Sequence, residues 1–133
     1  MRRIARRLRR DESAASMLEF ALVVPALFAM LFGIAELGIL FLAQAGLKNA
    51  VAEGARYATI SPRPSQTAIE NKITAKRFGM IAGAITGPTV SINTASSPAY
   101  VDISMGYSHT INFVLGSRTV TLSETRRAYM APS

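Results

Sequence analysis

The pattern of hydrophobic and polar positions changes along the chain, and its first part is a long apolar stretch. No polar side chain occurs from Phe20 to Ala35, and after Glu36 the apolar run resumes to Ala43, giving 24 positions with one polar residue. As a helix this stretch measures about 36 Å at about 1.5 Å per residue, whereas the hydrocarbon core of a bilayer is about 30 Å thick. The pattern predicts a membrane-spanning helix, because so short a chain has too little protein to surround it.

Beyond the apolar stretch the helical periodicity continues, but only one face remains apolar. The residues of that face are spaced by three and four positions: Leu47, Ala50, Val51, Gly54, Ala55 and Ala58. This spacing is typical of a helix that packs on a domain. The prolines after Ser61 end the helix, and Ser65 is a suitable N-cap for a second helix to about Ala82. Three apolar side chains are expected on the inner face of this second helix: Ile69, Ile73 and Met80.

The C-terminal part alternates with a period of two residues, which is the pattern of half-buried strands. The apolar positions form three sets: Val90 and Ile92; Val101, Ile103, Met105 and Tyr107; Val120 and Leu122. A turn cluster from Ala95 to Pro98 separates the first two. The sequence therefore predicts an α+β fold, in which a long N-terminal helix packs on a small antiparallel sheet beside a second short helix.

The positive charge is concentrated before the apolar stretch. Six of the 15 Lys and Arg residues are arginines within the first ten positions, and the rest of the chain has 9 basic against 8 acidic residues. Because the chain outside this arginine segment is nearly neutral, its charge gives little support for a nucleic-acid-binding surface. A basic segment before a span predicts a cytoplasmic N-terminus. We expect a basic cytoplasmic leader over residues 1–14, a transmembrane helix over 15–45, and a helix extension with a small outer α+β domain over 46–133.

Two other interpretations of the apolar stretch stay open. Ala43-Gln44-Ala45 has the small-x-small form of a signal-peptide cleavage site, which would make the rest a secreted protein. Signal h-regions are only about 7 to 15 residues long, so the stretch favours a span. An envelope protein that keeps its anchor, and whose outer domain binds or scaffolds a partner, is the other alternative.

Two carboxylates and a group of small residues occur in or beside the apolar stretch. Glu19 and Glu36 lie 17 positions apart, about 25 Å of helix, so each is expected near one boundary of the hydrocarbon. Glu36 either reaches into the headgroups or has a function. Glu19 begins the apolar helix, where a charge needs a cation that a helix N-terminus supplies only in part. If the chain were cut a few residues upstream, the new α-ammonium of a neighbouring subunit would be a suitable partner.

Pro25 is expected to kink or loosen the helix, because it lacks an N–H. Ala26, Ala29 and Gly33 follow at helical spacing, and such a stripe of small residues allows another helix to approach closely in a membrane. Chance composition explains such a stripe about as often as an interface does.

Three blocks of this sequence occur together in one known protein family. They are Asp11 to Pro25, with Glu19-Phe20-Ala21-Leu22 inside; Phe32-Gly33-Ile34-Ala35-Glu36-Leu37-Gly38; and Leu47 to Ala58, which ends in Glu53-Gly54-Ala55-Arg56-Tyr57-Ala58. In this order and spacing they resemble the TadE-like family of tight-adherence (Tad) pilus proteins. Members of that family are similar to type IV pilins and pseudopilins, which cross the bacterial inner membrane once.

The resemblance implies a processed membrane subunit. A prepilin peptidase on the cytoplasmic side removes the leader of such proteins five residues before the glutamate, which here falls between Ala14 and Ala15 and leaves Glu19 in fifth place. Ala14 departs from the family pattern, which has glycine there. The implied function is that of a minor pilin in Tad pilus assembly and adhesion. The implied partners are the peptidase, other pilin or pseudopilin subunits and the Tad inner-membrane platform, and the outer domain is periplasmic.

The candidate residues of the three blocks fall into two groups. The candidates for assembly and helix packing are Glu19, Phe20, Pro25, Ala26, Ala29, Gly33, Glu36 and Gly38. The candidates for docking the helix on the outer domain are Glu53, Gly54, Arg56 and Tyr57.

No residue pattern points to an enzyme. His109 is the only histidine and cysteine is absent, so a zinc site would need three clustered carboxylates. His109 is instead expected to be a solvated or hydrogen-bonded histidine at a strand end. Gly106-Tyr107-Ser108-His109-Thr110 lacks the final glycine of a nucleophile elbow. The sequence predicts a protein without catalytic activity, metal, cofactor, nucleic acid or small-molecule substrate.

Overall fold

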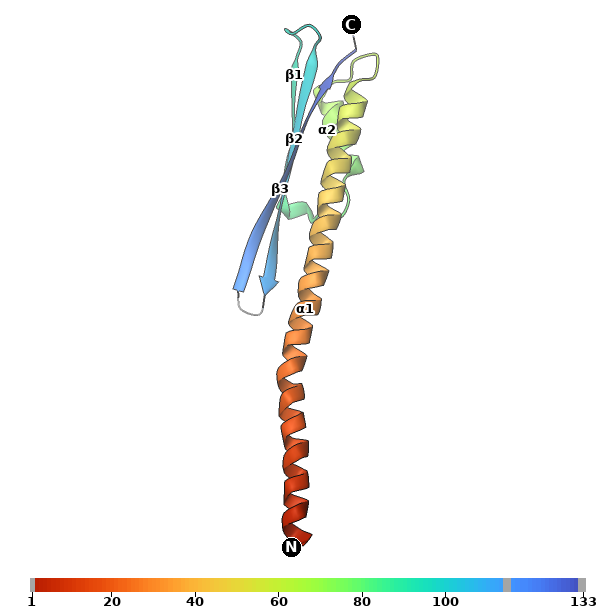
Figure 1. The fold of residues 1–133 in the computed structure, drawn as a ribbon. Helices are drawn as coiled ribbons and strands as arrows, with labels where there is room; N and C mark the ends of the chain where they lie inside the picture. Colours follow the sequence, from red (N-terminus) through yellow and green to blue (C-terminus); the bar gives the residue numbers. More distant parts are fainter. Residues whose placement is uncertain (1, 114–115, 132–133) are drawn as a thin grey trace.

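The structure, a computed structural model, describes residues 2–113 and 116–131. Its elements are α1 (Arg2–Ala58), α2 (Gln66–Lys76), the 3-10 turn η1 (Ala82–Ala84), β1 (Ile85–Asn93), β2 (Tyr100–Phe113) and β3 (Gly116–Tyr129). Figure 1 shows α1 extending far beyond the other elements, which gather beside its C-terminal half. The α+β fold is confirmed, with a long N-terminal helix, a second short helix and an antiparallel sheet.

α1 is one uninterrupted helix of 57 residues, which corresponds to about 86 Å. It passes through Pro25 without ending. Because proline has no N–H, this position removes one backbone hydrogen bond from the helix. The anchoring part and the docking part expected from the sequence therefore belong to the same continuous element.

The three strands form a sheet in the order β1-β2-β3, with both neighbouring pairs antiparallel. β1 pairs with β2 from Ile85 opposite Tyr107 to Asn93 opposite Tyr100. β3 pairs with the whole of β2, from Tyr100 opposite Tyr129 to Phe113 opposite Gly116. The expected alternation is confirmed, because the odd-numbered residues of β2 from Val101 to Tyr107 are buried and the even-numbered residues are not.

The core lies between the inner face of the sheet, α2 and the C-terminal half of α1. Its most deeply buried large side chains come from all three parts: Leu47, Val51, Ile69, Ile73, Val101, Ile103 and Tyr107. Met130 closes the end of the core, and its backbone N–H donates to the Ala99 carbonyl at 2.8 Å. The expectation that the amphipathic part of α1 supports the sheet is thus confirmed.

α2 begins where the sequence predicts and ends earlier. Ser65 is its N-cap, and the hydroxyl accepts from the Ala68 N–H at 3.2 Å. The expected end at Ala82 is wrong, because the helix stops at Lys76 and Arg77 is already extended. Gly79 has a φ of +68°, a conformation that favours glycine, and it lies against Leu42 of α1. After Lys76 the chain therefore turns at Gly79, and this turn packs on α1.

Candidate functional site

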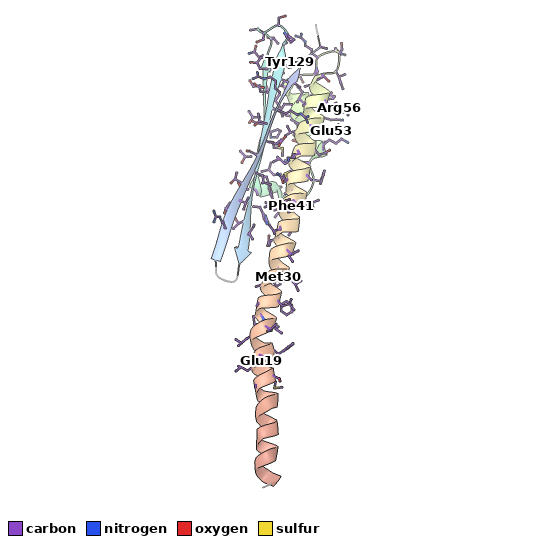
Figure 2. The ribbon with its side chains drawn as sticks, in the orientation of Figure 1. Glu19, Met30, Phe41, Glu53, Arg56 and Tyr129 are labelled. Atoms are coloured by element: carbon purple, nitrogen blue, oxygen red, sulfur yellow. The ribbon has the colours of Figure 1, made fainter. Side chains whose placement is uncertain are left out.

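Burial divides α1 into two parts. Residues 15–42, the exposed segment, contain no buried position, whereas buried positions recur from Ala43 to Ala58, the docking segment. Large apolar side chains are exposed through most of the exposed segment, among them Phe20, Phe28, Phe32 and Phe41. Figure 2 shows Glu19 on the part of the helix that extends beyond the domain.

The exposed segment has the properties of a membrane-spanning helix. A helix long and apolar enough to cross a membrane lies within Ala15–Ala58, and only 6% of its most apolar window is buried. A core helix of a soluble protein would be mostly buried. The exposure of apolar side chains all around the helix therefore fits a lipid environment.

The two residues of the expected cleavage site lie in α1, and the side chain of Ala14 is outside the described residues. Ala15 and Glu19 are exposed. Among the side chains that the structure describes, Glu19 has no ion-pair partner.

The small residues expected to let another helix approach lie in the exposed segment of α1. Ala26, Ala29 and Gly38 are exposed and Gly33 is half-buried. A Cβ built on Gly33 or Gly38 would have no neighbour within 4 Å. Since glycine in a helix costs about 1 kcal/mol relative to alanine, packing within this chain does not explain these two glycines.

Two other glycines of α1 are explained by packing within the chain. A Cβ on Gly54 would collide with the Ile73 side chain of α2, and a Cβ on Gly46 would collide with the Phe78 carbonyl. Gly54 is therefore the candidate docking residue whose function the structure shows most directly. Tyr57, also a candidate, is half-buried and packs against the core, with Lys72 Nζ 5.7 Å from its ring centre.

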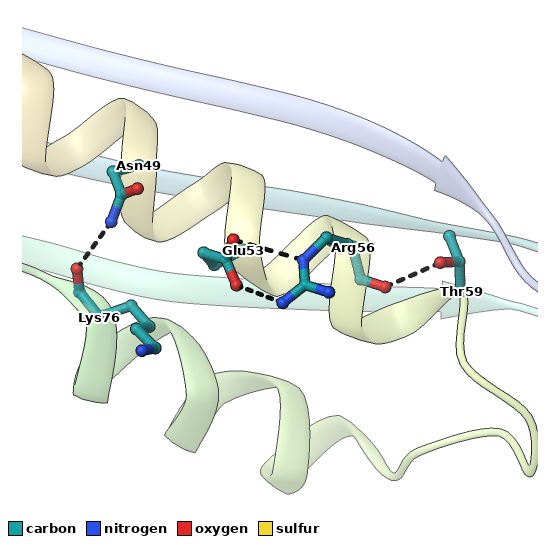
Figure 3. A network of polar contacts seen from close by, with 5 residues as sticks. All are labelled: Asn49, Glu53, Arg56, Thr59 and Lys76. Atoms are coloured by element: carbon teal, nitrogen blue, oxygen red, sulfur yellow. Dashed lines mark hydrogen bonds and ion pairs between the residues drawn. The ribbon is translucent and has the colours of Figure 1, made fainter.

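The remaining docking candidates, Glu53 and Arg56, form an ion pair on the outer face of the helix. Arg56 Nη2 lies 2.8 Å from Glu53 Oε2, and its Nε donates to Oε1 at 3.3 Å. The hydrogen bond from Arg56 holds the pKa of Glu53 below its usual value. Figure 3 shows this pair beside two other polar contacts, in which Asn49 donates to the Lys76 carbonyl and Thr59 to the Arg56 carbonyl. With 67% of its side chain exposed, Arg56 stabilises the helix locally more than it docks it.

The contact that sequence reasoning missed joins Glu36 to His109. The imidazole Nε2 of His109 on β2 donates to Glu36 Oε2 of α1 at 2.8 Å, across 73 residues of sequence. The Tyr107 ring stacks on the imidazole, with centroids 6.2 Å apart, and its hydroxyl lies 3.5 Å from Nδ1. Hydrogen bonding of His109 was expected, but at a strand end rather than within β2. The available signal was that a lone carboxylate in an apolar helix and a lone histidine both needed a partner.

Comparison with known proteins identifies one family. No curated protein and no solved structure matches the chain. Residues 14–56 match the family described as TadE-like protein. The matched range starts at the first residue of the expected cleavage site and covers the exposed segment and nearly all of the docking segment. The resemblance drawn from the three sequence blocks is thereby confirmed for residues 14–56, which are similar to the TadE-like family.

Proposed function

We propose that this protein is a minor pilin-like subunit of a Tad-type pilus or related secretion apparatus. α1 anchors it in the bacterial inner membrane, with the N-terminus in the cytoplasm and the α+β domain in the periplasm. A prepilin peptidase removes the leader between Ala14 and Ala15, and the subunit then contributes to pilus assembly and adhesion. It acts through contacts with other subunits and the inner-membrane platform, and it catalyses no reaction.

The observation that carries this proposal is the match of residues 14–56 to the TadE-like family, together with the exposure of the matched helix. The match is confined to α1 and does not extend over the sheet. If the function lies in this helix, the exposed side chains of the helix must contact lipid or another protein. Lipid and other subunits are the partners that an exposed apolar helix with open glycines accommodates.

The exposed carboxylate of Glu19 supports the processing step. Cleavage after Ala14 would remove the six arginines that hold the N-terminus in the cytoplasm. It would also create an α-ammonium four residues before Glu19, on a helix that neighbouring subunits pack against. Pairing of this ammonium with Glu19 of a neighbour would neutralise both charges inside the membrane. Subunit association would then be coupled to removal of the leader.

The N-terminal sequence of the protein from native membranes tests the proposal. Mass spectrometry of samples with and without active prepilin peptidase should give a peptidase-dependent start at Ala15. An uncleaved N-terminus in both samples would instead support a permanently anchored envelope protein, in which Ala14 blocks processing. A start at Gly46 would identify a signal peptide and contradict the pilin-like function.

A pair of carboxylate variants tests the function of Glu19 separately. Glu19→Ala should reduce pilus assembly or leader cleavage and leave the outer domain folded. Glu70→Ala is the matched control, because Glu70 lies on α2 and accepts a hydrogen bond only from Gln66 of the same helix among the described contacts. Equal pilus yields in the two variants would contradict the proposed pairing of Glu19.

A further inference from the structure

The end of the molecule farthest from the N-terminus contains a cavity of about 470 Å³, the distal cavity. Three segments that are distant in the sequence form its walls: the connection between α1 and α2, the turn between β1 and β2, and the residues that follow β3. Figure 1 shows these segments at the end of the molecule opposite the N-terminus. The volume is in the range of small-molecule sites, about 300 to 1,000 Å³.

Hydrogen bonds hold the three walls of the distal cavity together. Arg63 Nε donates to the Ala131 carbonyl at 2.7 Å, which joins the α1–α2 connection to the residues after β3. The Met130 N–H donates to the Ala99 carbonyl at 2.8 Å, which joins the same residues to the chain just before β2. Met130 and Ala99 are 5% and 7% exposed, so they give the cavity a buried apolar side.

The turn between β1 and β2 is fixed by Asn93. Its Oδ1 accepts from the Ala95 N–H at 3.0 Å and from the Ser96 hydroxyl at 3.4 Å. An asparagine that bonds the backbone two residues further on stabilises a tight turn. Thr94, Ser96 and Ser97 line the cavity from this turn and are therefore held in place before a ligand arrives, which reduces the entropic cost of binding.

The distal cavity has a positive charge at one wall. Arg63 is the only charged residue among the described residues that line it. Its Nε is bonded to Ala131, and the described hydrogen bonds and ion pairs include none from its two terminal nitrogens. A guanidinium binds a carboxylate through two parallel N–H···O bonds. Because Arg63 is half-buried, water screens this charge less than it would on an open surface. The cavity therefore fits an anionic group.

The neutral side chains narrow the class of anion. Thr94, Ser96 and Ser97 have hydroxyls, which both donate and accept hydrogen bonds, whereas a simple carboxylate only accepts. A ligand with hydroxyls of its own beside the carboxylate uses both capacities. The apolar side formed by Ala99 and Met130 suits the C–H face of a sugar ring. A uronic acid, which is a sugar with a carboxylate, combines these three features.

We infer that the distal cavity binds a uronic acid unit of an acidic polysaccharide. Arg63 binds the carboxylate, and the hydroxyls of Thr94, Ser96 and Ser97 bind those of the sugar. The inference deepens the adhesive function proposed above, and its biological meaning rests on that function. A subunit anchored by the exposed segment of α1 would present the distal cavity away from the membrane (Figure 1). The site lies outside residues 14–56 that match the family.

Titration with three small probes tests the ligand class. The full-length chain in detergent micelles would be titrated with D-glucuronate, D-glucose and acetate while NMR follows the Thr94 and Ser97 amides and the Arg63 Nε–H. We expect saturable shifts with glucuronate. Binding of glucose, which lacks the carboxylate, and of acetate, which lacks the hydroxyls, should be weaker by about tenfold or more.

Three results would overturn the inference. Absence of saturable shifts with glucuronate would show that the distal cavity does not bind it. Equal binding of glucose and glucuronate would show that Arg63 does not bind the carboxylate. Equal binding of acetate and glucuronate would assign the cavity to any carboxylate, including that of an acidic peptide. None of these results bears on leader cleavage or pilus assembly, so the pilin-like function stands or falls separately.

A matched pair of arginine variants tests the contact with the carboxylate. Arg63→Gln should weaken glucuronate binding by about tenfold or more. Arg126→Gln makes the same charge change at an exposed arginine that does not line the distal cavity, and it should leave binding unchanged. Equal effects of the two variants would show that net charge governs binding and would overturn the assigned contact.

A hydroxyl variant gives a test that leaves the Arg63–Ala131 bond in place. Ser97 is exposed and lines the cavity, so Ser97→Ala removes one hydroxyl with little effect on the fold. It should weaken glucuronate binding by about threefold and leave acetate binding unchanged. An unchanged affinity for glucuronate, or an equal loss for acetate, would overturn the assignment of the sugar hydroxyls to this turn.

Discussion

The two segments of α1 belong to one continuous helix but have opposite relations to the rest of the molecule. In the docking segment, apolar residues such as Leu47 and Val51 are almost fully buried, and Gly46 and Gly54 are required by close contacts with Phe78 and Ile73. In the exposed segment, most apolar residues are exposed, and a Cβ built on Gly33 or Gly38 would have no neighbour within 4 Å. The same residue types thus stabilise the fold in one segment and remain free for external partners in the other. A side chain's contribution depends on its surroundings rather than on the helix that carries it.

The largest expected difference comes from one substitution made in both segments. Leu47→Ala removes a side chain that is 1% exposed and should lower the free energy of unfolding by about 2–5 kcal/mol. Leu31→Ala, at a position 53% exposed, should change it by at most about 0.5 kcal/mol. Urea unfolding of the full chain in detergent micelles, followed by tyrosine fluorescence, measures both. Equal losses would contradict the division of the helix.

Glycine substitutions sharpen the same comparison. Gly54→Val would press a side chain into Ile73 and should cost about 1–3 kcal/mol of unfolding free energy. Gly33→Val meets open space and should leave the domain's stability within about 0.5 kcal/mol. Pilus yield should fall for Gly33→Val despite the intact domain. An unaffected pilus yield would show that Gly33 is no helix-packing position.

The Glu36–His109 bond joins the sheet to the exposed segment. Breaking it should loosen only the ribbon, the two-stranded end of the sheet formed by residues 108–113 and 116–121. Loss of a hydrogen bond to a charged group is worth about 1.5 kcal/mol, so His109→Phe should speed amide exchange in the ribbon about tenfold. Exchange near Val101 and Ile103 should stay as in the parent chain. Uniformly faster exchange along β2 would indicate that His109 supports the whole sheet instead.

The smallest expected effect is a pH dependence at the opposite end of the sheet. Arg127 donates to Asp102 from Nε at 2.7 Å and from Nη2 at 2.8 Å, which lowers the pKa of Asp102. Because the folded pKa lies below the ordinary value of 3.8, the pair stabilises the fold above about pH 4 and loses this contribution as the pH falls through the folded pKa. In an NMR titration, Arg127→Gln should raise the Asp102 midpoint. An unchanged midpoint would contradict the pairing.

The sequence predicted the features that local patterns determine. The apolar periodicity predicted α1 and its division into an exposed and a docking segment. Ser65 marked the start of α2, and the alternation of apolar and polar residues located the three strands. The end of α2 was mispredicted, because the helix stops at Lys76, before the glycine at 79 whose φ is +68° and whose missing side chain leaves room for Leu42.

The candidate site was predicted in part for the same reason. Gly54 was identified from a block of family-like sequence, and its contact with Ile73 explains it. The partner of Glu36 was missed, because His109 is 73 residues away in the sequence and the register of the sheet decides which residue of β2 lies beside Glu36.

Site-specific photo-crosslinking at Ala29 in living cells tests most directly the central claim that the exposed segment of α1 serves partners outside the chain. A photoreactive residue there should give protein adducts in cells that assemble the Tad pilus, and these adducts should disappear in cells that lack the other Tad proteins. An adduct pattern identical in both strains, or lipid adducts alone in both, would contradict the claim that the exposed segment assembles with pilus subunits.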